Sequence, residues 1–186
     1  GRPINEGCLI SAGLLLHAGC KASLESAVGL GDAALVRQFA SDYPNRFKND
    51  GTKRLGLLQI AVLADNLKMV DLLLDLGCHP DDRYKLLEYE IKPDSWGQPL
   101  WNAAGDGQHE IAELLLEAGA DPNAGVYASG TPVSQAYNNR DEQMKGLLLR
   151  YGGVLEAQFA GLEGETAAAA VHLQNDPGLA ERLLWA

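Results

Sequence analysis

Leucine triplets recur along the chain, and a glycine follows each triplet at the same offset. They stand at Leu72–Leu74 with Gly77, Leu114–Leu116 with Gly119, and Leu147–Leu149 with Gly152. The last two triplets begin at positions 114 and 147, which gives a period of 33 residues (147 − 114 = 33). A period of this length predicts a solenoid of stacked units, in which each unit buries its apolar face only against its neighbours.

Residues 98–123 form the clearest unit, and they predict two short helices followed by a turn. Pro99 suits the first turn of a helix, where its missing N–H costs no hydrogen bond. Gly107 ends that helix after about two turns. The second helix has its apolar stripe at i, i+3 and i+4, on Ile111, Leu114 and Leu115. Gly119 then closes this helix in a left-handed conformation, and Asp121–Asn123 turns the chain.

Other stretches of the chain repeat this order of apolar and turn residues. The predicted units start near positions 22, 56, 98, 131 and 166. This pattern predicts an all-α fold, a repeat solenoid of stacked antiparallel helix pairs over residues 22–186. The leucine-rich stretch within residues 1–21 stands too close to the first unit to form a complete unit, so we expect an N-terminal capping helix there.

These units resemble ankyrin repeats over about residues 22–186. The family pattern runs Thr-Pro-Leu-His-x-Ala-Ala, then Gly-His, then Val-Val-x-Leu-Leu-Leu-x-x-Gly-Ala. It is matched best by residues 98–123 and by the next unit, which opens with Thr131-Pro132-Val133. The resemblance implies helix pairs with β-hairpin fingers projecting between them. It also implies a protein that binds other proteins and catalyses no reaction.

The chain departs from the family pattern at the signature histidine. Other residues stand at that position in the units, namely Gln59, Trp101, Ser134 and Ala169. The hydrogen bonds that the histidine makes in the family therefore do not carry over to this chain.

One step between units is longer than the others, and its extra residues lie in 81–94. Leu87, Tyr89 and Ile91 alternate there with charged residues, which predicts a strand with one apolar face and hence an elongated finger. Two interpretations stay open. The finger is either an arm that contacts a partner or an insertion folded back onto its own stack, since loop insertions cost little free energy.

A partner-binding surface is expected along the fingers and the inner helices. Exposed aromatic side chains are typical binding hot spots, and in ankyrin-like proteins the inner ends of the first helices line the concave surface. The expected partner contacts are Tyr84, Tyr89, Trp96, Asp106, Tyr127, Asn138 and Asn139. For the polar members of this set, a solvated loop without a partner is the alternative.

The composition narrows the class of partner. The formal net charge is −10, and such an acidic chain repels the phosphates of nucleic acids and of anionic lipids. No apolar run approaches the roughly 18 residues needed to cross a bilayer. Cys8, Cys20 and Cys78 form an odd set without metal-ligand spacing, so we expect free thiols in a reducing, intracellular compartment such as the cytoplasm. The expected partner is another protein, and the chain itself is expected to be a monomer.

A search for catalytic motifs finds none with specific spacing. The sequence holds no phosphate-binding loop, dinucleotide glycine fingerprint or nucleophile elbow. The densest cluster of potential metal ligands, Cys78–Asp82, places its ligands side by side instead of at the spacing that wraps a zinc ion. We therefore expect no catalytic residues, metal or cofactor. The alternatives to a protein-binding module are a structural spacer within a larger protein and an enzyme built on the same stack.

Overall fold

The computed structural model describes residues 22–48, 56–82, 98–126, 130–156 and 166–176. In these ranges helices follow one another in pairs. The pairs are α2 (Leu24–Leu30) with α3 (Ala33–Asp42), α4 (Leu57–Leu63) with α5 (Leu67–Asp75), α6 (Pro99–Gly105) with α7 (His109–Glu117), and α8 (Pro132–Asn138) with α9 (Glu142–Arg150). A 3₁₀ turn, η1 (Pro44–Arg46), follows α3, and α11 (Thr166–Asn175) follows the last pair.

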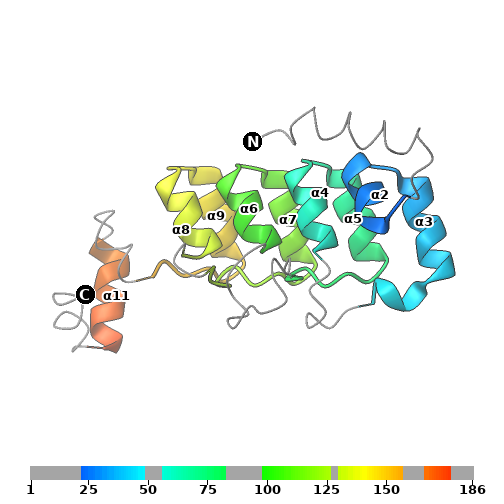
Figure 1. The fold of residues 1–186 in the computed structure, drawn as a ribbon. Helices are drawn as coiled ribbons and strands as arrows, with labels where there is room; N and C mark the ends of the chain where they lie inside the picture. Colours follow the sequence, from blue (N-terminus) through cyan, green and yellow to red (C-terminus); the bar gives the residue numbers. More distant parts are fainter. Residues whose placement is uncertain (1–21, 49–55, 83–97, 127–129, 157–165, 177–186) are drawn as a thin grey trace.

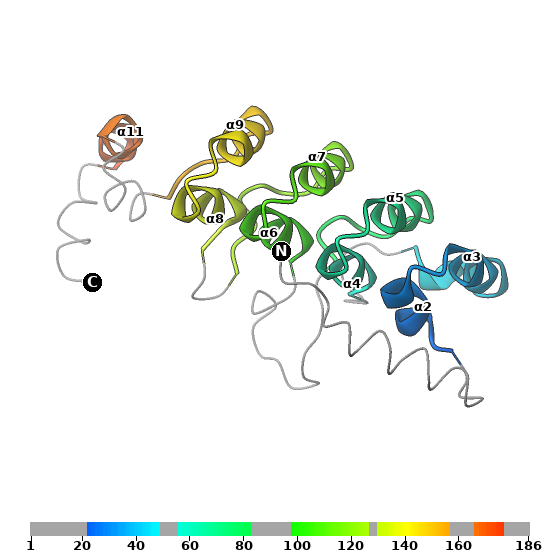
Figure 2. The ribbon, with the colours of Figure 1, turned by 90° about the horizontal axis from the view of Figure 1, so that it is seen from above.

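The helix pairs stand side by side and form a stack (Figure 1). Seen from above, the first helices α2, α4, α6 and α8 make one row, and the second helices α3, α5, α7 and α9 make the other (Figure 2). Neighbouring first helices pack together more closely than neighbouring second helices. The stack therefore bends toward the first-helix row, which becomes its concave side.

Small side chains explain the closer packing of the first helices. Each first helix buries an alanine four residues before the turn that follows the helix, at Ala27, Ala61, Ala103 and Ala136, and none of these is more than 1% exposed. The second helices bury leucines at their matching positions, at Leu73, Leu115 and Leu148. Because the distance between two helix axes follows the size of the side chains in contact, alanines let the first-helix backbones come closer.

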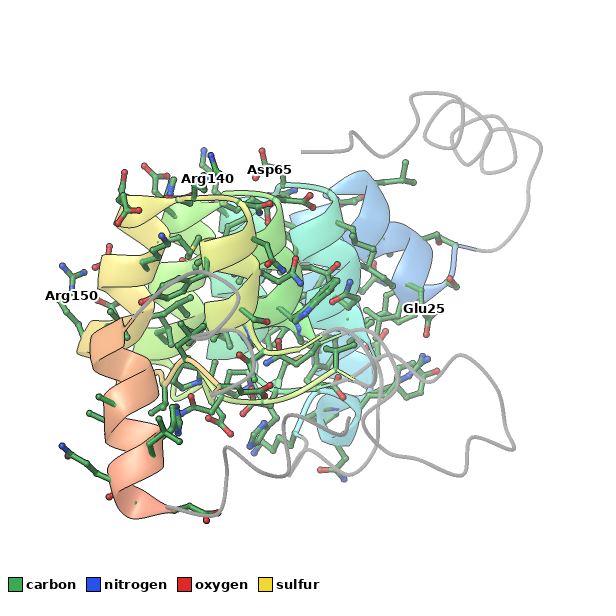
Figure 3. The ribbon with its side chains drawn as sticks, turned by 90° about the vertical axis from the view of Figure 1, so that its left-hand side faces the viewer. Glu25, Asp65, Arg140 and Arg150 are labelled. Atoms are coloured by element: carbon green, nitrogen blue, oxygen red, sulfur yellow. The ribbon has the colours of Figure 1, made fainter. Side chains whose placement is uncertain are left out.

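Each pair turns at one residue in the left-handed conformation. The turn residues are Gly31, Asp65, Gly107 and Arg140, with φ of 74°, 51°, 68° and 54°. The next residue caps the second helix in three of the pairs, where Asp32, Asn66 and Asp141 accept a hydrogen bond from the third N–H of the helix. Asp65 and Arg140 lie along the same edge of the stack (Figure 3). Both occupy a conformation that glycine adopts without steric cost.

The predicted all-α solenoid of antiparallel helix pairs is confirmed. The predicted β-hairpin fingers are not confirmed, because the β-pairing in the described ranges is a single isolated bridge between Val126 and Gly130. The predicted capping helix within 1–21 and the strand predicted around Leu87–Ile91 lie outside the described residues.

Candidate partner-binding face

Two positions of each first helix face outward from the concave side. Counted back from the left-handed turn residue, they lie five and two positions before it. They are Ser26 and Gly29, Ile60 and Leu63, Asn102 and Gly105, and Gln135 and Asn138. The two positions between them are buried in every pair, whereas these eight are partly or fully exposed. We call the surface formed by these eight residues the concave face.

The concave face carries no charged side chain, although the chain as a whole has a net charge of −10. Acidic residues gather instead on the second helices, as with Asp71 and Asp75 on α5 and Glu110, Glu113 and Glu117 on α7. Removing water from an uncharged polar group costs far less free energy than removing it from an ion. Charged residues are accordingly depleted at the centre of protein interfaces. The composition of the concave face therefore suits a protein contact.

An apolar spot lies on α4 within the concave face. Leu63 is 42% exposed, and Ile60 shares its side of the helix one turn earlier. Gly29 lies against this spot, since a Cβ atom placed there would make an ordinary van der Waals contact with Ile60 Cγ2, at 3.5 Å. Gly105 has the same relation to the next unit, since its Cβ would lie 3.4 Å from Gln135 Oε1. At both glycines, therefore, a side chain of the following unit lies close to the preceding first helix.

A side-chain hydrogen bond joins α6 to α4 beside this spot. Asn102 donates through Nδ2 to Gln59 Oε1 at 3.2 Å and to the Gln98 carbonyl oxygen at 3.0 Å. Gln59 stands where the repeat signature has its histidine, and it is only 6% exposed. In this chain a glutamine therefore accepts a hydrogen bond between units at the signature position.

The turn end of the first helices holds a second group of polar residues. Asn139 donates through Nδ2 to the Gly105 carbonyl oxygen at 2.8 Å, which ties α8 to the end of α6. Asp106 caps α6 and lines an open cavity of ≈440 Å³ together with Asp65 and Glu110. The amide of Asn139 therefore already has a structural partner, and Asp106 lies among other carboxylates.

A hydrogen bond between His109 and Asp141 links neighbouring units near this cavity. His109 Nε2 lies 2.8 Å from Asp141 Oδ2. Partial burial raises the pKa of the Asp141 carboxyl, but hydrogen bonds from the Met144 N–H and from His109 outweigh that effect and lower the pKa below its ordinary value. A carboxyl with a lowered folded-state pKa stabilises the fold above its ordinary titration range, and that contribution is lost as pH falls through the lowered pKa.

At the opposite end of the pairs, two aspartates hold the chain where it leaves α5. Asp82 is fully buried and accepts a hydrogen bond from the Gly56 N–H at 3.1 Å. Asp81 accepts from Gln98 Nε2 and from the Asp121 N–H, both at 3.2 Å. Burial raises the pKa of the Asp81 carboxyl even though these hydrogen bonds oppose the shift. The two carboxylates thus connect the base of the 81–94 insertion to the units on both sides.

Asn123 occupies the place of Asp81 one unit later. Its Oδ1 accepts from the Val154 N–H at 2.8 Å, and its Nδ2 donates to the Gly152 carbonyl oxygen at 3.0 Å. Asp81 accepts the matching hydrogen bond from the Asp121 N–H, since Asp121 stands one unit before Val154. Asp81 and Asn123 therefore each join their unit to the next one through the same position of the repeat.

The sequence itself supports this architecture independently. A family model described as ankyrin repeats, in three copies, matches residues 24–126, which is more than half of the chain. The chain belongs to the ankyrin repeat family. Ankyrin repeats are generally protein–protein interaction modules and typically lack enzymatic activity. No curated protein matches the chain.

The ankyrin stack places three of the predicted partner contacts together. Asp106, Asn138 and Asn139 all lie at the turn end of first helices, and Asn138 and Asn139 are exposed. The first helix α8 has 7 residues, so about 10 Å separates the turn end from the finger end. The remaining predicted contacts, Tyr84, Tyr89, Trp96 and Tyr127, lie outside the described residues.

Sequence reasoning overlooked most of the concave face. It assigned no role to Ile60, Leu63, Asn102 or Gln135. A usable signal was nevertheless present. All of them lie at fixed distances from the turn residue of their unit, and that residue can be located in each repeat.

The described ranges hold one cysteine, Cys78, and no cluster of potential metal ligands. No three His, Cys, Asp or Glu side chains converge there in a group that could hold a metal ion. Burial is the main cause that raises the pKa of the Cys78 thiol to about 12, and the negative charge of Asp82 adds to it. This cysteine therefore keeps its proton at neutral pH. Among the described helices of the ankyrin stack, none is long and apolar enough to cross a membrane.

Proposed function

We propose that this ankyrin stack binds a partner protein along the concave face of its first helices. The observation that carries the proposal is the uncharged character of that face in a chain of net charge −10, together with the exposed Leu63 at its centre. A partner segment that presents an apolar side chain between amide or hydroxyl groups matches this surface. The apolar side chain would contact Leu63 and Ile60, and the polar groups would meet Asn102, Gln135 and Asn138.

The predicted contacts extend this surface at both ends of the helices. Asp106, Asn138 and Asn139 supply polar groups at the turn end. Tyr84, Tyr89, Trp96 and Tyr127 are proposed as the finger contacts, on the ground that exposed aromatic side chains dominate many protein interfaces. On this proposal the partner spans about one helix length, from the fingers to the turns.

The proposal is tested by capturing partners from a lysate and identifying them by mass spectrometry. Leu63→Arg and Asn138→Arg each place a cation on the concave face. Gln38→Arg and Gln143→Arg make the same charge change on exposed positions of the second helices α3 and α9. A partner that binds the concave face should be lost with the first two variants and kept with the last two.

One double variant examines the predicted finger contacts. Replacing Trp96 and Tyr127 together with alanine should weaken capture of the same partner by more than about 2 kcal/mol, the size expected for hot-spot aromatic residues, without changing thermal unfolding. If all captured proteins bind the concave variants as well as the second-helix variants, the concave face is not the binding surface.

A further inference from the structure

A groove lies on the opposite, convex side of the ankyrin stack, between the second helices α5 and α7. Its volume is ≈390 Å³, and its lining includes Leu67 and Leu114, which are partly buried against the core. The other lining residues are Lys68, Asp71, Glu110, Glu113 and Glu117. The groove therefore combines an apolar floor with four carboxylates and one ammonium group.

The charges that face this groove differ from those of the next interval along the stack. Between α7 and α9, Arg150 Nη2 lies 3.4 Å from Glu113 Oε1, so opposite charges meet across that interval. Arg150 takes the place in α9 that Glu117 takes in α7 and Asp75 takes in α5. Glu113 likewise takes the place in α7 that Asp71 takes in α5. The pair between α5 and α7 that corresponds to Arg150 and Glu113 is therefore Glu117 and Asp71, and both are acidic.

Like charges on neighbouring helices lower the stability of the stack through mutual repulsion. A cationic group placed between them removes that repulsion, and an apolar side chain on the leucine floor removes apolar surface from water. Both gains are available to one ligand when its cations flank an apolar residue. A second copy of this chain is a poor occupant, because its own net charge is −10.

We propose that the groove between α5 and α7 binds a basic segment of a partner protein. Apolar side chains of the segment contact Leu67 and Leu114, and lysines or arginines on either side pair with Asp71, Glu110 and Glu117. The helices α5 and α7 have 9 residues each, so a segment of about 13 Å fills the groove. The groove shares no residue with the concave face, which allows the stack to hold two protein segments at once.

The test uses the full chain and a synthetic, fluorescein-labelled helical peptide, with two leucines four residues apart and lysines on both sides. Binding is followed by fluorescence anisotropy at low ionic strength. Asp71→Asn combined with Glu117→Gln should weaken the binding of this peptide about fivefold or more. Asp42→Asn combined with Glu142→Gln removes the same charge at a distance from the groove and should change affinity less than twofold. Replacing the two leucines of the peptide with serine should also weaken binding about fivefold or more.

Several results would overturn the proposal. Equal weakening by both pairs of substitutions would mean a diffuse attraction to an acidic protein. Undiminished binding of the serine peptide would mean that the leucine floor takes no part. If spermidine displaces the peptide from wild-type protein at matched charge concentration, the groove is a small-cation site instead. Leu63→Asn leaves the groove intact and should leave peptide affinity unchanged, which separates this test from that of the concave face. Urea unfolding of each variant verifies that it is folded.

Discussion

Replacing Asp81 with asparagine should stabilise this ankyrin stack at neutral pH. The protein already contains the intended geometry one unit later, where Asn123 donates to the Gly152 carbonyl oxygen at 3.0 Å. Asp81 makes the matching acceptor contact with the Asp121 N–H. The Gly119 carbonyl oxygen corresponds to that of Gly152 one unit later. Because an ionised carboxylate has no proton, Asp81 cannot donate a hydrogen bond to the Gly119 carbonyl oxygen. Asp81→Asn supplies the missing donor.

The size of the effect follows from two contributions. One additional hydrogen bond is worth about 0.5–1.5 kcal/mol net. Gln98 Nε2 reaches Asp81 Oδ1, and the Asp121 N–H lies 3.2 Å from both Oδ1 and Oδ2, so the amide oxygen of the variant keeps both bonds when it takes the place of Oδ1 and the new NH2 group turns away from the Asp121 N–H. The substitution also removes the cost of burying a carboxylate near the Asp121 side chain. Together we expect a gain of about 1–2 kcal/mol, or a rise in Tm of about 2–8 °C for a chain of this length.

The pH dependence of this gain has a definite sign. Burial raises the pKa of Asp81 above its ordinary value of 3.8, so the folded state binds this proton more tightly than the unfolded state. Wild-type stability therefore falls as pH rises from the ordinary value through the raised pKa, and the cost is complete above the raised pKa. Protonated Asp81 can also donate a hydrogen bond. The advantage of Asp81→Asn should thus be complete at pH 7 and should shrink as the pH approaches 4.

Urea unfolding followed by far-UV circular dichroism at pH 7 and pH 4 measures the effect. Asp75→Asn changes the net charge equally on an exposed part of α5 and should alter the free energy of unfolding by less than about 0.5 kcal/mol. Asn123→Asp makes the reverse change and should cost about 1–2 kcal/mol. The reasoning is refuted if Asp81→Asn and Asp75→Asn have equal stability at pH 7, or if the gain is as large at pH 4 as at pH 7.

Three further measurements examine the core, a turn and the buried thiol. Leu115 is 0% exposed, so Leu115→Ala should lower the free energy of unfolding by about 2–5 kcal/mol through the cavity it leaves. Leu149→Ala, at a 46% exposed position of α9, should have a small effect. An unchanged urea midpoint for Leu115→Ala would contradict its place in the core. Arg140 has φ of 54°, so Arg140→Gly should raise the free energy of unfolding by about 0.5–1 kcal/mol, and Gly107→Ala should lower it. A urea midpoint that falls for Arg140→Gly and rises for Gly107→Ala would show that the turn is not strained. Burial and Asp82 raise the pKa of Cys78 to about 12, so mass spectrometry should find this thiol alkylated only under denaturing conditions, and rapid alkylation of the folded protein would rule out its burial.

The helices could be predicted from the sequence because their signals are local. The stripe of Ile111, Leu114 and Leu115 marks one side of a helix, and Gly107 and Gly119 mark where helices end. Such signals involve residues within about two turns of one another, so they do not depend on how the units later pack. The same locality made the fold class and the family recognisable.

The candidate site was less predictable, because exposure and bonding depend on neighbouring units. Leu63 has an apolar side chain of the kind found in protein cores, yet it is 42% exposed on the concave face. Asn139 resembles a free surface amide, yet it donates to a carbonyl 34 residues away, at Gly105. The distance of Leu63 from the turn residue indicates its side of the helix, but the exposure of Leu63 and the hydrogen bond of Asn139 depend on which helix lies alongside.

By itself, the sequence determined where the helices and turns lie, that the chain is a repeat stack, and that it is strongly acidic. Only the tertiary structure decided which side is concave, which polar groups are already bonded, and where charges of one sign face each other. The reason is physical. Helix formation depends on residues three and four apart, whereas curvature depends on how closely the first helices and the second helices of successive units pack against one another. The acidic groove likewise exists only because stacking places Asp71 of α5 beside the carboxylates of α7.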